Sequence, residues 1–449
     1  MSKLGRAVVL ALLGALTLPD TCYGDNFTFS GYVKSYALAQ DSISIKSVDE
    51  NMPEQSISAN FQSQNALRFM TSYLSADLGN IEVHYEVQPL YFSNADMALY
   101  YTDESFSAVG NTISTASNQY RFKDLDSVLT DVGNHGVVLQ NLDRFNYQYS
   151  NQYGDLTIGR QVVSFGSARF INPTDIFIPF AIQTLNQEYR VGIDAVRFKA
   201  DVGDFAVIDV GLVIGKDGEK ENSAAFLRGK NSIQGNDIEV IAIVLDEAWL
   251  LGAGLERALG DFGFWFETAY MDWQQSANDI GNDFQGSDDQ GINFQDKNEA
   301  LYTDNYWRTS IGSDYALNED IIVMLEYHYN GAGDDEPEDY TELASQAPYQ
   351  KAGVYLYGEH YIIPAVTWLA SPLASLSASA FYNVSDGSMF FSLVNETSWS
   401  DNLYSDFGVY LSHGKSTVYQ TIEQEINYNV RSEFGAYPIS LYASLRYYF

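Results

Sequence analysis

The sequence of 449 residues is short of three features on which many proteins rely. It has one cysteine, Cys22, so it has no disulfide framework of its own. Its longest apolar run, Ala7 to Leu18, is too short for a membrane-spanning helix, which needs about 20 residues. Its 24 basic residues are outnumbered by 59 acidic ones, and the formal net charge is −35. This charge repels phosphate, so we exclude nucleic acid as a partner.

Recognisable catalytic and metal-binding motifs are also absent from the sequence. It contains no H-E-x-x-H, no G-x-S-x-G and no glycine-rich phosphate loop. Glu82, His84 and Glu86 share one face of an extended segment, but a polar lining explains them without a metal ion. We therefore expect a protein that is not an enzyme, with no cofactor and no metal site. A Ser–His pair that is assembled in space at one rim stays open as an alternative.

The N-terminus has the pattern of a secretory signal peptide. Two basic residues precede the apolar run, and small or turn-forming residues follow it. We predict cleavage after Gly24, which makes residues 1–24 the signal peptide and removes Cys22. The remaining residues, 25–449, are predicted to form one domain. An exported chain without cysteine needs no disulfide for its stability.

Aromatic residues are plentiful, with 33 Tyr and 26 Phe, and many lie in segments of alternating polarity. From Ile439 to Phe449 every second residue is apolar, and most residues between them are polar. Segments 81–88 and 321–330 alternate in a similar way. In an outer-membrane β-barrel the lipid face is apolar, the lumen face is polar and aromatic residues lie at the interfaces. A soluble sandwich can alternate too, but long aromatic-rich strands repeated along an exported chain favour the barrel.

Short and long connections alternate along the chain. Short connections, rich in the Gly, Asn and Asp that tight hairpins need, lie near residues 79–80, 153–154, 203–204, 260–261, 317–319, 371–372 and 401–402. Long ones occupy residues 41–63, 94–137, 164–188, 216–236, 274–299, 331–353 and 414–436. Short periplasmic turns and long external loops are typical of outer-membrane barrels. We predict an all-β, antiparallel transmembrane β-barrel of about sixteen strands, with Asp237–Gly260 as one long strand.

The apolar face, taken as lipid-facing, assigns the polar face to a water-filled lumen. The predicted pore-lining residues are Lys34, Arg68, Glu82, His84, Glu86, Arg144, Arg190, Asp194, Arg308, Asp314, Glu326 and Arg446. Opposed charges across a narrow pore would orient dipolar solutes and filter ions. The alternative is that these residues form ion pairs that only stiffen the wall. The acidic balance predicts a mild cation preference, tempered by the inward arginines.

The segment that follows residue 158 is predicted to fold into the lumen as a constriction. Its candidate constriction residues are Arg160, Arg169, Asn172, Pro173 and Asp175. Strand parity places Arg160 on the lipid face with Ile158, where an arginine costs about 2–4 kcal/mol at the membrane midplane. Either Arg160 lies at the outer rim or a bulge near Gly159 turns it inward. We favour the bulge, with Arg160 and Arg169 pairing with Asp175; a rigid external turn is the alternative for the loop.

This segment resembles porin-like outer-membrane proteins of Gram-negative bacteria. The matching motifs are Gly159-Arg160-Gln161, Phe165-Gly166 and Asn172-Pro173-Thr174-Asp175. Phe165 departs from the pattern, because Trp is common at that place. Glu326 to Gly331 is similar to a strand end of the group, and Phe449 is similar to its terminal aromatic residue, which the barrel-assembly machinery recognises. The rest of the chain agrees with the group only in pattern.

The resemblance implies a barrel in the Gram-negative outer membrane, surrounded by its lipids and lipopolysaccharide. We therefore expect a porin-like channel for passive or substrate-preferring diffusion of small hydrophilic solutes. Many such channels are trimers, so a homotrimer is a possible assembly. Two other classes stay open: an outer-membrane barrel enzyme such as a hydrolase, and a structural or adhesive barrel with an occluded lumen. The sequence specifies neither the solute nor whether the acidic segments 278–299 and 334–339 bind calcium.

Overall fold

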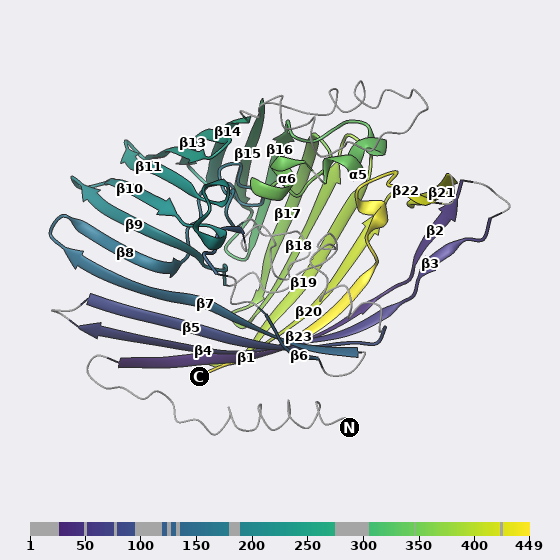
Figure 1. The fold of residues 1–449 in the computed structure, drawn as a ribbon, viewed down its shortest axis with the longest axis horizontal. Coiled ribbons are helices and arrows are strands. Elements are labelled where there is room, and N and C mark those ends of the chain that lie inside the picture. Colours follow the sequence, from purple (N-terminus) through teal and green to yellow (C-terminus); the bar gives the residue numbers. More distant parts are fainter. Residues whose placement is uncertain are drawn as a thin grey trace.

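The computed structural model describes residues 27–48, 52–75, 79–94, 119–123, 127–131, 135–178, 189–273, 305–344, 346–422 and 425–449. Most of this described chain is β-structure (Figure 1). The predicted signal peptide, residues 1–24, and the acidic segment 278–299 lie outside the described residues. Within the described ranges, no helix has the length and apolar character that a membrane span requires.

Eighteen antiparallel strands of the described chain close into a barrel. In order around the ring they are β1 (Phe27–Gln40), β4 (Asn60–Ser75), β5 (Gly79–Phe92), β7 (Gly136–Asn151), β8 (Gly154–Gln161), β9 (Ile193–Val202), β10 (Ala206–Val213), β11 (Ala224–Ile233), β12 (Asn236–Leu245), β13 (Ala248–Leu259), β14 (Phe262–Trp273), β15 (Asn305–Ala316), β16 (Ile321–Asn330), β17 (His360–Ser371), β18 (Ala374–Asn383), β19 (Met389–Ser400), β20 (Leu403–His413) and β23 (Ser440–Tyr448). β23 pairs with β1 and closes the ring. The predicted antiparallel barrel is confirmed.

The predicted number of about sixteen strands is wrong, because one hairpin is hidden in the sequence. β11 lies in the segment 216–236, which the sequence pattern assigned to a loop. β12 and β13 divide the segment 237–260, which was assigned to one strand. Their connection is only Asp246-Glu247, which has none of the usual turn residues. The two omissions add two strands, so the strand number stays even.

Smaller elements decorate the external end of the barrel. β2 (Ile43–Ser47), β3 (Gln55–Ile57), β21 (Val418–Ile422) and β22 (Glu425–Asn429) form a four-stranded sheet that stands out beyond the wall (Figure 1). β6 (Ser127–Asp131) pairs with β7. The short helices are η2 (Lys216–Gly218), η3 (Lys220–Asn222), η4 (Pro337–Asp339), α5 (Tyr340–Leu343), α6 (Ala347–Lys351) and η5 (Phe434–Ala436).

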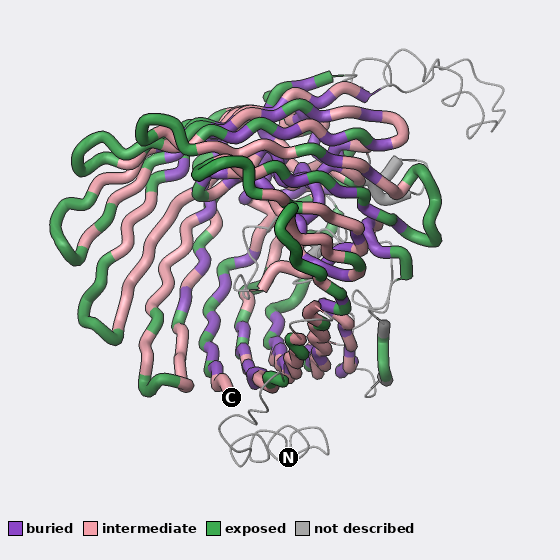
Figure 2. Tube along the Cα trace, turned by 90° about the vertical axis from the view of Figure 1, so that its left-hand side faces the viewer, coloured by how far each residue is buried: buried purple, intermediate pink, exposed green. Residues whose placement is uncertain are grey.

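The wall has an apolar outside. In β10, Ile208, Val210 and Leu212 are 44%, 42% and 58% exposed, whereas Asp209 between them is buried. The same alternation of buried and exposed residues runs along several strands in Figure 2. Exposed apolar side chains repeated over so many strands are unfavourable in water and favourable in hydrocarbon. The outward face is therefore the lipid face of the barrel.

The seam of the barrel is closed by the last residue. The amide of Phe449 donates to the carbonyl of Gly31 over 3.0 Å, and the amide of Gly31 donates to the carbonyl of Phe449 over 2.8 Å. The Phe449 ring lies 6.1 Å from Phe29 and 6.4 Å from Phe69, centroid to centroid. The terminal aromatic residue thus joins β23 to β1 and β4.

External connections fold back into the barrel and pack on its inner face. Residues 162–178, here called the lumen loop, contribute Val163, Phe165 and Phe177 to an apolar cluster with inward side chains of β9 to β15. Residues 355–358 and 434–437 contribute to a second cluster on β17 to β20 and β23. Ile171 of the lumen loop belongs to that second cluster. Most of the buried apolar core of this barrel therefore lies inside its external half.

Candidate functional site in the barrel lumen

The lumen loop lies against β13 to β16. Glycines on the wall make room for it, because a Cβ on Gly252 would meet Thr174 Cγ2 at 2.4 Å and one on Gly254 would meet Ser167 Oγ at 2.9 Å. Within the loop, Gly166 has a φ of 107°, and a Cβ there would meet the Asn172 side chain at 2.3 Å. The glycine of the sequence motif therefore packs closely against the Asn-Pro turn. The loop and the wall have complementary shapes.

Arg160 does not turn inward through a bulge at Gly159, which was the favoured prediction. Its register with Phe145 in β7 and with Asp194 in β9 is unbroken, so the interpretation of a bulge at Gly159 is wrong. Gly159 has a φ of 114°, but it keeps its place in both ladders. Arg160 keeps the outward parity of Phe145, which is 58% exposed. It lies near the external end of β8, which agrees with the alternative that places Arg160 at the outer rim.

The ion pairs expected around Asp175 are also different. Arg160 pairs with Asp194 at 2.9 Å, and Arg190 takes the place of Arg160 and Arg169 beside Asp175. Burial raises the pKa of Asp175, and the neighbouring Arg190 opposes this effect. Arg169 is instead 3.4 Å from Glu256. Asp194 shares the outward parity of Arg160, so its assignment to the pore lining is wrong.

The carbonyl of Asn172 accepts the amide of Asp175 over 3.2 Å, and Pro173 lies in the turn between them. This turn brings Thr174 back to the wall, where its hydroxyl donates to Glu267 over 2.7 Å. The motif residues Asn172, Pro173 and Asp175 therefore shape the part of the loop that touches β14.

Three arginines converge on one buried carboxylate on the inner face of β4 and β7. Asp143 lies 2.9 Å from Arg68, 2.9 Å from Arg144 and 3.9 Å from Arg121. A register shift opposite His84 gives β7 an extra residue here, which turns Arg144 to the lumen side. Asp143 and Arg121 were not among the predicted residues. The bulge hides Asp143 from simple parity, and Arg121 comes from a loop.

Lys34 lies on the neighbouring strand in an aromatic surrounding. Its Nζ is 4.2, 5.2 and 5.7 Å from the ring centroids of Tyr32, Tyr189 and Tyr448. Such cation–π contacts stabilise a desolvated ammonium group. Arg446, whose Cα faces that of Lys34 across the ladder, pairs with Glu396 and with Asp406. These predicted lumen residues face inward on adjacent strands.

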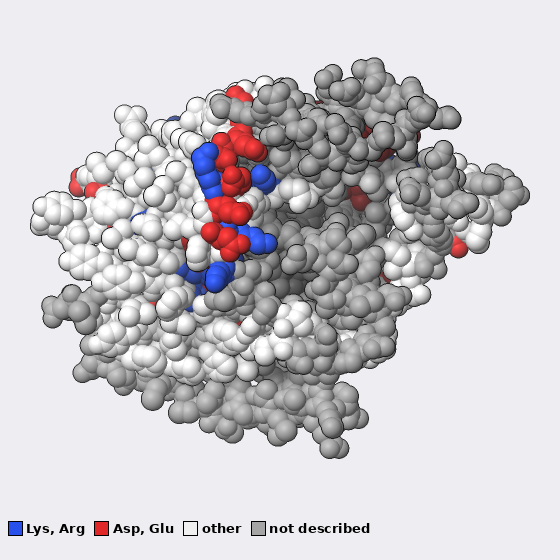
Figure 3. All heavy atoms as spheres, in the orientation of Figure 1, with Lys and Arg blue, Asp and Glu red and all other residues white. Residues whose placement is uncertain are grey.

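A second group of ion pairs spans β9 to β12. Arg197 pairs with Asp209, and Arg228 pairs with Glu239 at 2.6 Å and reaches Asp209 at 3.9 Å. The signs alternate from strand to strand. None of these four residues was predicted. The position of Asp209 between the apolar Ile208 and Val210 does, however, indicate that Asp209 faces the lumen. On the face shown in Figure 3, acidic and basic side chains gather in one narrow band.

The other predicted lining residues also lie on inward positions. Glu82 and His84 face one another on β5, with 3.0 Å between His84 Nε2 and Glu82 Oε1. Asp314 accepts the amide of Gly263 over 3.2 Å. The remaining inward residues are Glu86, Arg308 and Glu326, which are all nearly inaccessible. Arg190 follows the lumen loop and pairs with it, so it is not part of the wall itself.

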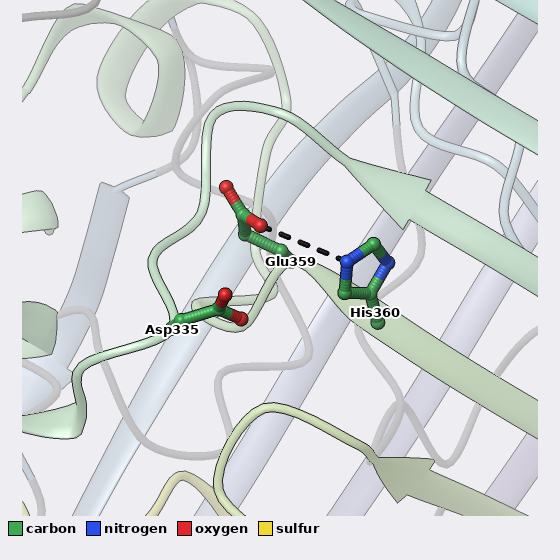
Figure 4. Close-up of side chains that lie close together, drawn as sticks. All are labelled: Asp335, Glu359 and His360. Atoms are coloured by element: carbon green, nitrogen blue, oxygen red, sulfur yellow. Dashed lines mark ion pairs between the residues drawn. The ribbon is translucent and has the colours of Figure 1, made fainter.

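One group of described residues has ligand atoms close enough for a metal ion. Atoms of Asp335, Glu359 and His360 all lie within 4.8 Å of one another, and Figure 4 shows the three side chains clustered beside β17. His360 Nε2 is 3.7 Å from the Glu359 carboxylate, and its Nδ1 is 2.9 Å from the Tyr327 hydroxyl. Burial and the nearby Asp335 raise the pKa of Glu359. The group lies at the external end of β17.

A Ser–His pair exists, but its surroundings differ from those that hydrolysis needs. Ser310 Oγ and His328 Nδ1 are 2.8 Å apart, and both residues are fully buried. Ser310 donates its hydroxyl proton to the carbonyl of Ile171 over 2.6 Å, so the imidazole is the donor in the Ser–His bond. A nucleophilic serine needs the opposite direction and access to substrate. The pair holds the lumen loop to the wall.

Comparison with solved structures finds matches that cover nearly the whole chain at low sequence identity. OprD from Pseudomonas aeruginosa has a TM-score of 0.49 at 10% identity, over 94% of this chain and 93% of that one. OccAB4 from Acinetobacter baumannii has a TM-score of 0.47 at 7% identity, over 94% and 98%. OccK8 (OprE) from Pseudomonas aeruginosa has 0.49 at 7%, over the same shares. No protein-family model and no curated protein matches the sequence.

Proposed function

We propose that the chain is an outer-membrane channel through which small hydrophilic solutes diffuse. The observation that carries this proposal is the contrast between the two faces of a closed wall. Outward side chains are apolar, whereas inward ones include the ion pairs of Asp143 and Arg68 and of Arg228 and Glu239. Charged groups require water or partners, and in a membrane they belong on the lumen side.

The lumen loop is proposed to be the constriction of this channel. Its residues Ser167 and Thr174 contact Glu267 on β14. Tyr189, shortly after the loop, lies 4.9 Å from the Arg68 guanidinium on β4, measured to the ring centroid. β4 and β14 are nine steps apart in either direction around the 18-strand ring. The described residues on the two sides of this connection, 162–178 and Tyr189, thus contact opposite walls, which supports the proposed constriction.

The charges of the lumen are proposed to orient solutes more than to exclude ions of one sign. Arg197, Asp209, Arg228 and Glu239 alternate in sign, and each contacts an opposite charge. Alternating charges produce strong local fields with a small net potential. The mild cation preference expected from the acidic composition therefore stays a prediction that rests on charges elsewhere in the chain.

A barrel with an occluded lumen is the second candidate function. It is favoured by the two apolar clusters that the inserted loops form inside the external half of the barrel. In this case the chain would be a structural or adhesive protein. The two candidates differ in whether a continuous aqueous path remains beside the loops.

Planar-bilayer recording separates the two. The purified mature chain is added to a bilayer in symmetric KCl, and discrete current steps are expected for a channel. A KCl gradient then gives the reversal potential, which we expect to shift slightly toward the Nernst potential of K+. A folded protein that inserts into bilayers but conducts no ions would contradict the channel and favour the occluded barrel.

A further inference from the structure

Two wall carboxylates hold the lumen loop by its backbone. The amides of Ser167 and Ala168 donate to Glu267 over 2.7 and 3.0 Å, and the amide of Thr174 donates to it over 2.9 Å. The next three amides, of residues 169–171, donate to Glu326 over 3.0, 3.3 and 3.0 Å. Five consecutive amides of the loop thus point at two carboxylates on strands β14 and β16.

Each carboxylate has a further side-chain donor. The Thr174 hydroxyl lies 2.7 Å from Glu267, and the Trp265 indole donates to Glu326 over 2.8 Å. Glu267 is 1% exposed and Glu326 is inaccessible. A buried carboxylate is costly unless its oxygens are hydrogen-bonded, and bonds to a charged acceptor are roughly twice as strong as neutral ones. Among the described residues, these loop amides have no other carboxylate acceptor, and the two carboxylates have no other backbone donor.

The arrangement fixes where the loop places its charged side chains. The loop has two, and Asp175 is 2% exposed whereas the Arg169 side chain is 44% exposed. The amide of Arg169 is one of those that donate to Glu326. Its guanidinium lies over the Trp265 ring at 5.2 Å and beside Glu256. Arg169 is therefore the charge that the loop presents to the lumen.

We propose that Glu267 and Glu326 are positioning residues that clamp the lumen loop and thereby set the place of Arg169 in the bore. This rests on the proposed channel function and adds to it the residues that define its narrow part. Neither carboxylate acts on a solute directly, because both are covered by the loop. Their removal would release the loop from the wall while the barrel stays closed.

The clamp is tested by a cross-link that needs no transport. An ideal Cβ on Gly254 lies 3.9 Å from Ser167 Cβ, close to the mean of about 3.8 Å for disulfides. Ser167→Cys with Gly254→Cys, in a Cys22→Ser background, is therefore expected to oxidise rapidly to a disulfide. Adding Glu267→Gln and Glu326→Gln should slow this oxidation at least about tenfold. Each Gln lacks the negative charge of the carboxylate, and its side-chain NH2 group is a donor that would face the amide donors of the loop.

Glu396→Gln is the matched control. Glu396 is a wall carboxylate on β19 that pairs with Arg446 and has no described contact with the loop. It is expected to leave the cross-linking rate within a factor of about two, since Glu396 is 49% exposed and Arg446 keeps its second partner, Asp406. Heat-modifiable mobility in gels confirms that each variant is a folded barrel. Equal cross-linking rates with and without the two clamp carboxylates would overturn the proposal.

A second measurement reads the position of Arg169. In bilayers, Arg169→Gln should shift the reversal potential toward the cation potential, and the clamp variants should increase open-channel current fluctuations. A clamp variant with the steady current of the parent contradicts the proposal. If neither parent nor variants conduct while the cross-link behaves as expected, the channel function fails and the clamp stands.

Discussion

Replacement of Asp143 by Asn tests whether the charges of the wall are balanced as described. Asp143 is fully buried and accepts the amide of Gly192 over 2.8 Å besides its three arginine contacts. Removal of one member of a buried ion pair costs about 3–5 kcal/mol, because the partner stays buried without compensation. Arg68 retains Glu86 at 2.9 Å, so only Arg121 and Arg144 lose their carboxylate. We therefore expect a loss of about 3 kcal/mol, at the lower end of that range.

The assay is equilibrium unfolding by urea in lipid vesicles, followed by tryptophan fluorescence. Glu256→Gln is the control, since its Arg169 partner is 44% exposed and such pairs contribute about 0–1 kcal/mol. The free energy of unfolding should fall much further for Asp143→Asn than for this control. A loss below about 1 kcal/mol for Asp143→Asn would refute the view that one carboxylate compensates the arginines of β4 and β7.

Three further predictions concern the lumen loop, the buried Glu433 and the lipid face. Gly252→Ala would place a Cβ 2.4 Å from Thr174 Cγ2, and we expect a loss of about 1–3 kcal/mol in urea unfolding. Burial raises the pKa of Glu433 from 4.5 to about 8, so the folded chain keeps a proton that the unfolded chain releases. Stability should therefore fall by up to about 1.4 kcal/mol per pH unit as pH rises between these values, and Glu433→Gln should abolish that dependence in unfolding measured against pH. Val210→Arg on the lipid face should cost about 2–4 kcal/mol in vesicles, whereas Ser377→Arg on the lumen side should cost less than about 1.

The alternation of polarity predicted the barrel because lipid and water impose opposite demands on the two faces of one strand. It failed where a strand carries polar residues on both faces. β11 includes Arg228, Lys230 and Asn231 near its periplasmic end and therefore resembles a loop. The two-residue connection Asp246-Glu247 lacks the glycine that marks a tight turn, so β12 and β13 merged into one predicted strand.

For the lumen loop, the sequence predicted the inward path of the chain but not all of its ion pairs. The motif around Asn172 predicted a loop folded into the barrel, and parity assigned Glu326 to the inner face. The pairing of Asp175 with Arg190 and of Arg160 with Asp194 depends on the path of the loop through space, which spacing along the chain does not encode. The alternation of polarity therefore predicted the face of Glu326 but not the partners of Asp175 and Asp194.

The central claim is that water lies inside the closed wall and hydrocarbon outside it, and a cysteine scan along residues 375–380 of β18 measures this directly. Ser375, Ser377 and Ser379 lie on the inner parity that leads to buried Phe381, and Leu376, Ala378 and Ala380 lie on the other. In lipid vesicles, cysteines at the three serine positions should react with a water-soluble thiol reagent. A fluorophore attached to a cysteine at any of the three positions between them should be quenched only by a lipid-soluble quencher. Uniform reactivity along the segment, or the reverse alternation, would contradict the account.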